Sequence, residues 1–79
     1  MTPSKLDRER LVIEVHRREA DDLAALLHAL EVDCGEPTPD PDTGEMLITL
    51  APYMDAAELD RADALVTEFN KMRSTRAAF

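Results

Sequence analysis

The chain has 79 residues, a single cysteine and a formal net charge of −8. A chain of this length has room for one hydrophobic core, so we expect one domain over residues 1–79, and Cys34 has no partner for an internal disulfide. Every apolar run is far shorter than the ~20 residues that a membrane-spanning helix needs, and the charged N-terminus lacks the apolar core of a secretory signal. We therefore expect a cytoplasmic protein.

Acidic side chains are concentrated in the body of the chain. Residues 19–68 carry fourteen acidic side chains and one basic side chain, Arg61, whereas residues 1–18 and 69–79 are each mildly basic. Because an acidic surface repels the phosphates of nucleic acids, direct nucleic-acid binding through this body is unfavourable.

The first predicted element is a strand over residues 11–16, preceded by a loose lead-in over residues 1–9. The strand segment is rich in β-branched residues, and its side chains alternate in polarity. The side chains expected to face the core are Leu11, Ile13 and Val15. One long helix over residues 4–30 is the alternative, but its apolar stripe would pass through Arg10 and Arg17, so the strand is favoured.

Residues 19–30 have the apolar spacing of an amphipathic helix, with acidic side chains in the first turn. The apolar stripe contains Ala20, Leu23, Ala24, Leu27 and Leu30, with Leu26 at its flank. The helix is expected to end by Val32, and residues 32–34 are a candidate for a short strand. Residues 35–45 contain three prolines, two glycines and no aliphatic or aromatic side chain, which predicts a loop.

The next strand is predicted over residues 46–50, and the clearest signal in the chain follows it. Residues 55–74 form an amphipathic helix in which Asp55 and Glu58 have the spacing of an N-cap and its capping-box partner. Its apolar stripe contains Leu59, Ala62, Leu65, Val66, Phe69 and Met72. Residues 75–79 are expected to be a C-terminal tail.

Together these elements predict an α+β fold in the order β-α-(β)-β-α. We expect a short two- or three-stranded sheet with both amphipathic helices on one face. The residues predicted to be nearly inaccessible to solvent are Ile13, Leu27, Ile48, Leu65 and Phe69.

The second face of this sheet is expected to combine apolar and polar side chains. Strand alternation assigns to it Val12, Glu14, His16, Leu47 and Thr49. A domain of this size gains stability by burying more apolar surface, so the face is a candidate for homodimerisation across a two-fold axis. Isolated exposed apolar residues are also ordinary on monomers, which is the alternative. Glu14 opposes dimerisation, because it would approach its own symmetry mate unless a cation pairs with it.

The Pro/Asp-rich loop contains two partial motifs. Asp42-Thr43-Gly44 matches the tripeptide of aspartic proteases, but it follows Pro-Asp-Pro rather than an apolar strand, so we interpret it as a hairpin turn. Asp40, Asp42 and Gly44 match the start of a calcium loop, yet the position of its bidentate twelfth ligand holds Ala51. We predict that the acidic side chains in and before this loop are solvated, namely Glu31, Asp33, Glu36, Asp40, Asp42 and Glu45.

His16, His28 and Cys34 are the remaining candidates for chemistry. One cysteine and two separated histidines do not supply the closely spaced ligands of a zinc site. His28 lies six residues before Cys34, so a base near the thiol is conceivable, but no third, orienting group is indicated. We therefore predict no catalytic residue, no cofactor and no metal site.

The sequence favours a small, acidic, non-enzymatic protein–protein interaction domain. We expect a homo-oligomeric accessory or regulatory factor, of a bacterium or its phage, that binds another protein and has no membrane partner or small-molecule substrate. Two alternatives are an acidic mimic of nucleic acid, which would occupy the basic site of a DNA-binding protein, and a small transcription regulator or antitoxin that uses the basic ends.

Overall fold

The computed structural model describes the backbone of residues 3–77 and the side chains of residues 3–72. In chain order its elements are β1 (Lys5–Asp7), β2 (Val12–Val15), α1 (Ala20–Ala29), β3 (Thr38–Pro39), β4 (Met46–Thr49) and α2 (Ala56–Ala77). The α+β class agrees with the prediction. Within the described residues the sheet has four antiparallel strands in the order β1-β2-β4-β3, whereas two or three strands were expected.

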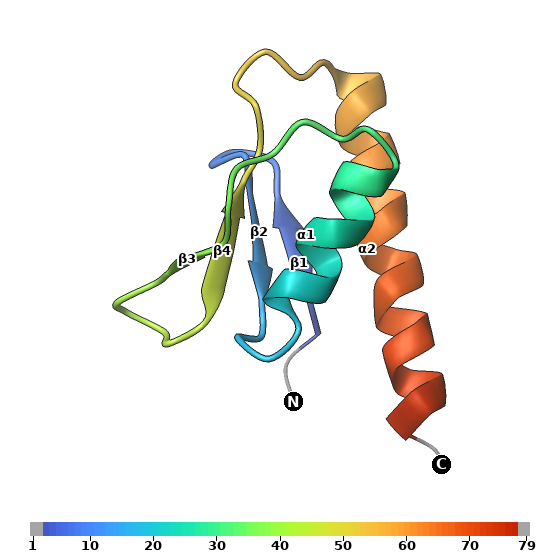
Figure 1. Cartoon of the computed structure of the whole chain (residues 1–79). Helices are drawn as coiled ribbons and strands as arrows, with labels where there is room; N and C mark the ends of the chain where they lie inside the picture. The colour runs from blue at the N-terminus through green and yellow to red at the C-terminus, as the bar shows by residue number, and fades with distance from the viewer. Residues whose placement is uncertain (1–2, 78–79) are drawn as a thin grey trace.

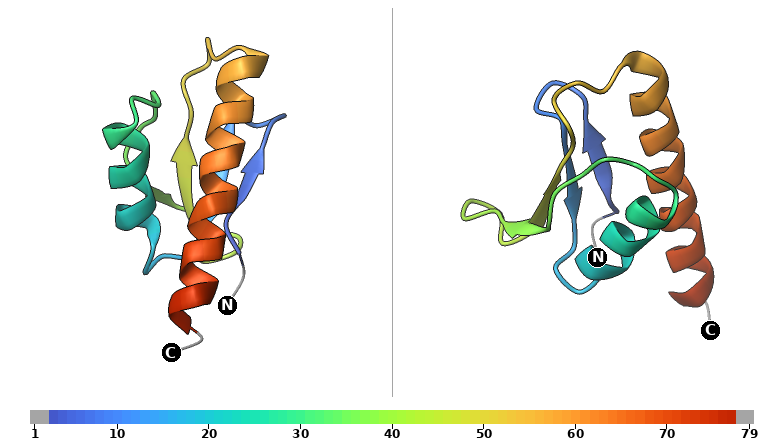
Figure 2. Two further views of the ribbon diagram at one scale, coloured as in Figure 1. Left: turned by 90° about the vertical axis from the view of Figure 1, so that its right-hand side faces the viewer. Right: turned by 45° about the horizontal axis from the view of Figure 1, so that its top comes forward.

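Both helices lie on the same side of the sheet. Figure 1 shows α1 and α2 to the right of the strands, and the left-hand view of Figure 2 shows α2 in front of the sheet with α1 beside it. α1 contacts β4, and α2 contacts β1 and α1. In the part of the chain that the structure describes, the other side of the sheet carries no helix.

β1 corrects the prediction of a loose lead-in over residues 1–9. The segment Lys5–Asp7 pairs with β2, and the register places Leu6 opposite Ile13. Three residues with a single apolar side chain have no detectable period, so this strand depends on its ladder with β2 rather than on its own pattern.

The turn between β1 and β2 is closed by a side chain. The Oδ1 atom of Asp7 accepts hydrogen bonds from the backbone N–H groups of Glu9 (3.0 Å) and Arg10 (3.1 Å). Leu11, which was predicted to lie in the strand, has φ of 54° and belongs to this turn. The strand therefore begins at Val12, one residue later than expected.

The Pro-rich segment 35–45 was predicted to be a loop, but it contains β3. Thr38 and Pro39 pair with Leu47 and Met46 of β4. Proline lacks the N–H that an interior strand must donate, and β3 lies at the edge of the sheet, where this is tolerated. Residues 32–34, the other candidate for a strand, form only a single bridge, between Cys34 and Leu50.

α1 ends in a Schellman motif. The backbone N–H of Val32 donates to the carbonyl of Leu27 (2.9 Å), and the N–H of Glu31 donates to the carbonyl of His28 (3.1 Å). Glu31 has φ of 61°, the left-handed conformation that glycine usually adopts at this position. The helix thus ends within the predicted limit, although the nearest glycine is Gly35.

α2 begins as its sequence predicts. The Oδ1 atom of Asp55 accepts a hydrogen bond from the backbone N–H of Glu58 at 2.9 Å, which confirms Asp55 as the N-cap. The helix continues to Ala77 and so extends past the predicted end at residue 74 into the expected tail; residues 78–79 lie outside the described residues.

The core lies between the sheet and the two helices. Ile13, Leu27 and Ile48 are fully buried, as predicted. α2 contributes Ala62 and Val66 as its most buried side chains.

The prediction that Leu65 and Phe69 are nearly inaccessible is wrong, because both are only partly buried. α2 has 22 residues and is about 33 Å long, whereas a four-residue strand spans only about 13 Å. The C-terminal part of the helix therefore extends beyond the sheet, as Figure 1 shows, and Met72 is 51% exposed.

Candidate functional site

Four of the five residues predicted for self-association share the side of the sheet away from the helices. In the register of β2 and β4, Val12 is opposite Thr49 and Glu14 is opposite Leu47. Their neighbours Ile13 and Ile48 are fully buried on the helix side. We call this side the outer sheet face, formed by Lys5, Asp7, Val12, Glu14, Thr38, Leu47 and Thr49.

The fifth residue, His16, follows the end of β2 and takes part in the turn into α1. Its Nδ1 atom accepts a hydrogen bond from the backbone N–H of Arg18 at 3.1 Å, and its carbonyl accepts one from the N–H of Glu19 at 2.9 Å. His16 is half-buried. Its ring therefore stabilises a turn at the end of the outer sheet face.

β1 adds two residues to this face that were not predicted from the sequence. Lys5 lies opposite Glu14, and Asp7 lies opposite Val12. The only sequence signal for this strand is the polar–apolar–polar alternation of Lys5, Leu6 and Asp7. Three residues are too few to distinguish a strand from a loop. Lys5 is important because it places a cation beside Glu14.

The apolar residues of the outer sheet face differ in exposure. Val12 is only 8% exposed, although it lies outside the core cluster, because it sits in an interior strand between Asp7 and Thr49. Leu47 is half-buried, and Thr49 is exposed. Leu47 therefore offers more apolar surface to a partner than Val12 does.

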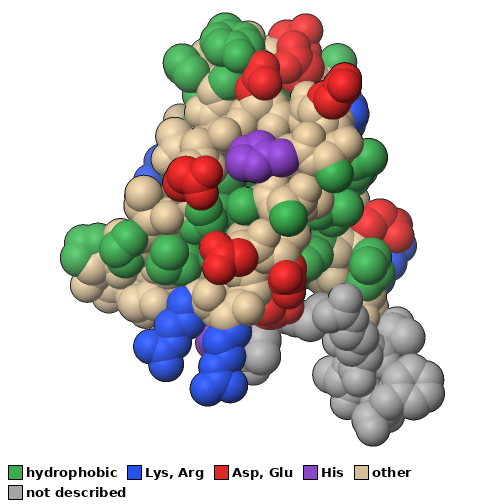
Figure 3. Space-filling view, viewed as in Figure 1, with side chains coloured by type: hydrophobic (Ala, Val, Ile, Leu, Met, Phe, Trp, Pro, Cys, Tyr) green, Lys and Arg blue, Asp and Glu red, His purple; other side chains and the backbone are tan. Residues whose placement is uncertain are grey.

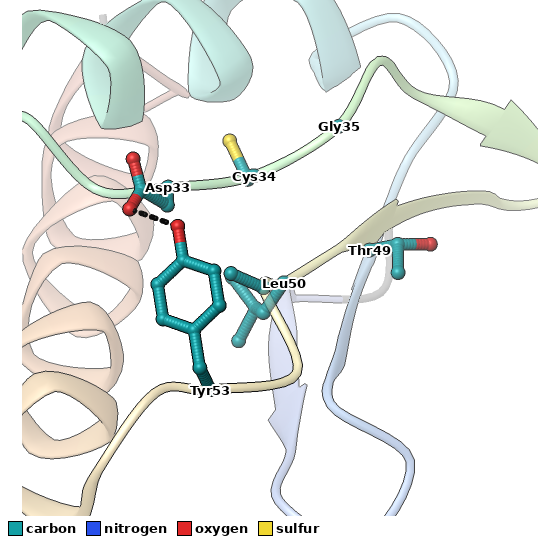
Figure 4. Close-up of a pocket in the computed structure, with 7 residues that line it drawn as sticks. Asp33, Cys34, Gly35, Thr49, Leu50 and Tyr53 are labelled. Carbon is teal, nitrogen blue, oxygen red and sulfur yellow. Dashed lines mark hydrogen bonds between the residues drawn. The ribbon is translucent and has the colours of Figure 1, made fainter.

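A shallow pocket of about 350 Å³ surrounds Cys34 (Figure 4). It is lined by Asp33, Cys34, Gly35, Thr49, Leu50, Ala51 and Tyr53. The segment after α1 forms one wall, and the end of β4 with the following loop forms the other. Thr49 thus belongs both to this Cys34 pocket and to the outer sheet face.

The Cys34 thiol is not activated. Partial burial raises its pKa, and the negative charges of Asp33 and Glu36 raise it further. The protonated thiol is a weak nucleophile, because the thiolate is the reactive form.

Tyr53 and His28, which lie near Cys34, do not assist the thiol. The Tyr53 hydroxyl donates a hydrogen bond to Oδ2 of Asp33 at 2.6 Å (Figure 4), and this bond is the main reason that the pKa of Tyr53 is raised. Nε2 of His28 lies 3.3 Å from the backbone carbonyl oxygen of Cys34. The structure therefore brings His28 to the backbone of Cys34, with no base–thiol hydrogen bond among the described residues.

The Asp42-Thr43-Gly44 tripeptide lies in the turn between β3 and β4, as predicted. Oδ1 of Asp40 accepts a hydrogen bond from the N–H of Asp42 at 2.9 Å, and the carbonyl of Asp40 accepts one from Gly44 at 3.0 Å. Gly44 has φ of 75°, which favours glycine. Asp40 itself is only 8% exposed, and the hydrogen bonds that it accepts stabilise this turn. The expectation that its side chain is simply solvated is therefore wrong.

Figure 3 shows acidic side chains distributed over the visible face, with basic side chains at its lower edge near the turn between β2 and α1. Over residues 3–77, no three His, Cys, Asp or Glu side chains gather closely enough to bind a metal ion. Neither helix in that range is long and apolar enough to cross a lipid bilayer. Comparison of the chain with protein-family models, with curated proteins and with solved structures found no match.

Proposed function

We propose that this chain is a small, non-enzymatic protein–protein interaction domain that forms a homodimer through the outer sheet face and, as a regulatory or accessory factor, binds another protein. The observation that carries this proposal is the in-register alignment of Val12, Glu14, Leu47 and Thr49 on a sheet face that neither described helix covers.

The size of the domain favours additional burial. A 79-residue chain hides only about 60% of the surface that it exposes when unfolded, so covering one more sheet face adds a substantial fraction of its stability. A fully buried leucine contributes about 1.5–3 kcal/mol, and a two-fold interface contains each contact twice. Leu47 is already half-buried in a single copy, so it provides part of this contribution in each copy.

The carboxylate of Glu14 is the main cost of such an interface. Two copies would bring two Glu14 side chains towards each other, which is unfavourable if they are unpaired. Lys5 lies opposite Glu14 in the sheet, so each copy also brings a cation to the interface. An exchange of Lys5–Glu14 pairs between copies would turn the repulsion into attraction.

Sedimentation velocity over a concentration series up to high micromolar tests the proposal. We expect the wild type to change from monomer to dimer, and Leu47→Asp to sediment as a folded monomer. Ala64→Asp is the matched control, because it introduces the same charge at an exposed position of α2 and should leave the dimer intact. A wild type that remains monomeric throughout, or variants that behave alike, would contradict the proposal.

A further inference from the structure

The four-stranded sheet has two edges, β1 on one side and β3 on the other. The backbone of an edge strand carries N–H and C=O groups that point away from the sheet, and such groups pair readily with a strand of another molecule. Because the two edges of this sheet differ, pairing β1 of one copy with β3 of the next would not close on itself and would grow into a filament.

The β3 edge lacks N–H groups where an added strand would need them. The backbone N–H of Asp40 donates to the carbonyl of Glu45 at 2.8 Å, so the backbone of Asp40 faces β4. The backbone groups of successive residues in a strand point alternately to its two sides, so those of Pro39 face outwards. Proline has no N–H, and Pro37, directly before the strand, has none either. An added strand would find no donor at either position.

The same edge contains a β-bulge. Cys34 pairs with Leu50, and Thr38 pairs with Leu47. Four steps along the edge therefore correspond to three steps along β4, so one residue of the edge is in excess. A bulge interrupts the regular spacing of outward backbone groups that an added strand has to match.

A side chain of α1 occupies the edge at Cys34. The N–H of Gly35 donates to the carbonyl of Thr49 at 2.8 Å, and the carbonyl of Asp33 accepts a hydrogen bond from β4's following loop at 3.2 Å. Both neighbours of Cys34 thus face β4, so the carbonyl of Cys34 faces outwards. This carbonyl oxygen lies 3.3 Å from Nε2 of His28. The imidazole stands where the N–H of an added strand would be.

The β1 edge is covered in a different way. The backbone N–H and carbonyl of Ser4 bond to the carboxamide of Asn70, each at 2.9 Å, and Ser4 is only 5% exposed. Asn70 therefore takes the place of a neighbouring strand. Because Ser4 faces outwards, alternation leaves Leu6 as the only residue of β1 whose backbone groups do so.

α2 also holds the other end of this edge. Arg8 follows β1 directly, and its guanidinium donates to the carboxylates of Asp60 at 2.7 Å and Asp63 at 3.3 Å. α2 contacts β1, and the left-hand view of Figure 2 shows the two side by side. An added strand would have to displace contacts of α2 at both ends of β1.

We propose that both edges of the sheet are closed to strand addition, so that a second copy or another protein meets this sheet through the side chains of the outer sheet face. The closure depends on the contacts of the edges, whereas the use of the face rests on the proposed function. Closed edges stop assembly at a dimer, because stacked faces pair once and unprotected edges would continue to pair.

Replacing the edge prolines tests the closure. Pro37→Thr with Pro39→Thr returns two N–H groups to the β3 edge, and threonine suits a strand. We expect this variant to form assemblies larger than a dimer, seen by sedimentation velocity and by thioflavin T fluorescence, at concentrations where the wild type forms none. Pro41→Thr with Pro52→Thr is the matched control, because it removes two exposed prolines outside the strands and should sediment as the wild type does.

Circular dichroism shows whether each variant is folded. If the double variant is unfolded, the single variant Pro39→Thr decides, and it should form the same assemblies at higher concentration. A folded edge variant that sediments like the wild type would overturn the closure. Equal assembly of the edge and control variants, or large sheet assemblies of the wild type itself, would do the same.

A combined variant separates the closure from the proposed dimer. Leu47→Asp alone should remain a monomer, whereas Leu47→Asp with Pro37→Thr and Pro39→Thr should still assemble, because its edge is open although its face is blocked. A wild type that stays monomeric, with an edge variant that assembles, removes only the dimer. A wild-type dimer, with an edge variant that stays a dimer, removes only the closure.

Discussion

The carboxamide of Asn70 forms two hydrogen bonds with the backbone of Ser4, as a neighbouring strand would. Its Oδ1 atom accepts a hydrogen bond from the Ser4 N–H, and its Nδ2 atom donates one to the Ser4 carbonyl, each at 2.9 Å. These residues are 66 positions apart, so the pair ties the C-terminal helix to the start of the N-terminal strand. It also holds Ser4 in the wall of a pocket that Lys5, Glu14 and Glu45 line as well.

Replacing Asn70 should therefore destabilise the domain. Asn70→Ala leaves two partly buried backbone groups of Ser4 without their partners, and we expect a loss of about 1–3 kcal/mol in the free energy of unfolding. Thr67→Ala is a suitable control, because the Thr67 hydroxyl bonds only to the Asp63 carbonyl of its own helix. Urea denaturation followed by circular dichroism measures both. Equal denaturation midpoints for wild type and Asn70→Ala would show that the hydrogen bonds between Asn70 and Ser4 contribute nothing to the free energy of unfolding.

Glu31 offers a stabilising substitution. It has φ of 61° at the end of α1, where a residue with a Cβ atom is strained and glycine is not. Glu31→Gly should raise the free energy of unfolding by up to about 1 kcal/mol. Glu36→Gly, at an exposed position without positive φ, should lower it slightly or leave it unchanged. Thermal melts that show no gain for Glu31→Gly relative to Glu36→Gly would refute the assignment of strain.

Truncation of leucines distinguishes the centre of the core from its margin. Leu27 is fully buried, and Leu27→Ala should cost about 2–5 kcal/mol, a large part of the free energy of unfolding of a small domain. Leu65 is only partly buried, so Leu65→Ala should cost clearly less. Denaturant midpoints compare the two variants; a larger loss for Leu65→Ala would reverse this description of the core.

Cys34 should react slowly at neutral pH. Because burial and the charges of Asp33 and Glu36 raise its pKa, the thiolate fraction is small, and alkylation by iodoacetamide should be slower than for a cysteine in an unfolded peptide. The rate should rise with pH and level off above the ordinary pKa of a thiol. Asp33→Asn removes a negative charge, lowers the pKa and should speed the reaction at a given pH. Asp42→Asn, which does not contribute to the shift, should not change the rate.

The elements that the sequence predicts well are those that carry their own pattern. α2 shows its apolar period over many residues, and Asp55 caps its first turn through a contact only three residues away. The apolar spacing of α1 likewise predicts its buried face, which contains Leu23 and Leu27. A helix makes its backbone hydrogen bonds within one segment, so local sequence contains most of the information that defines it.

The short strands depend on partners that are distant in sequence. Thr38–Pro39 lies in a segment with loop composition and becomes a strand only because β4 offers it an edge. Lys5–Asp7 is a strand because β2 lies beside it, and this pairing places Lys5 next to Glu14. Strand hydrogen bonds join different segments, so their existence is decided by the tertiary arrangement and is not visible in a window of the sequence.

The candidate sites divide in the same way. Alternation along single strands was enough to put Val12, Glu14, Leu47 and Thr49 on one face, because side-chain direction in a strand has a fixed period of two. The pocket beside Glu14 could not be anticipated, since residues of β1, β2, the β3–β4 turn region and α2 line it together. Nor could the partial exposure of Leu65 and Phe69, because it depends on which side of α2 meets the core, and the most buried positions of this helix are Ala62 and Val66. Periodicity assigns a side chain to a face of its element, but only the packed structure determines which residues that face contacts and how deeply it is buried.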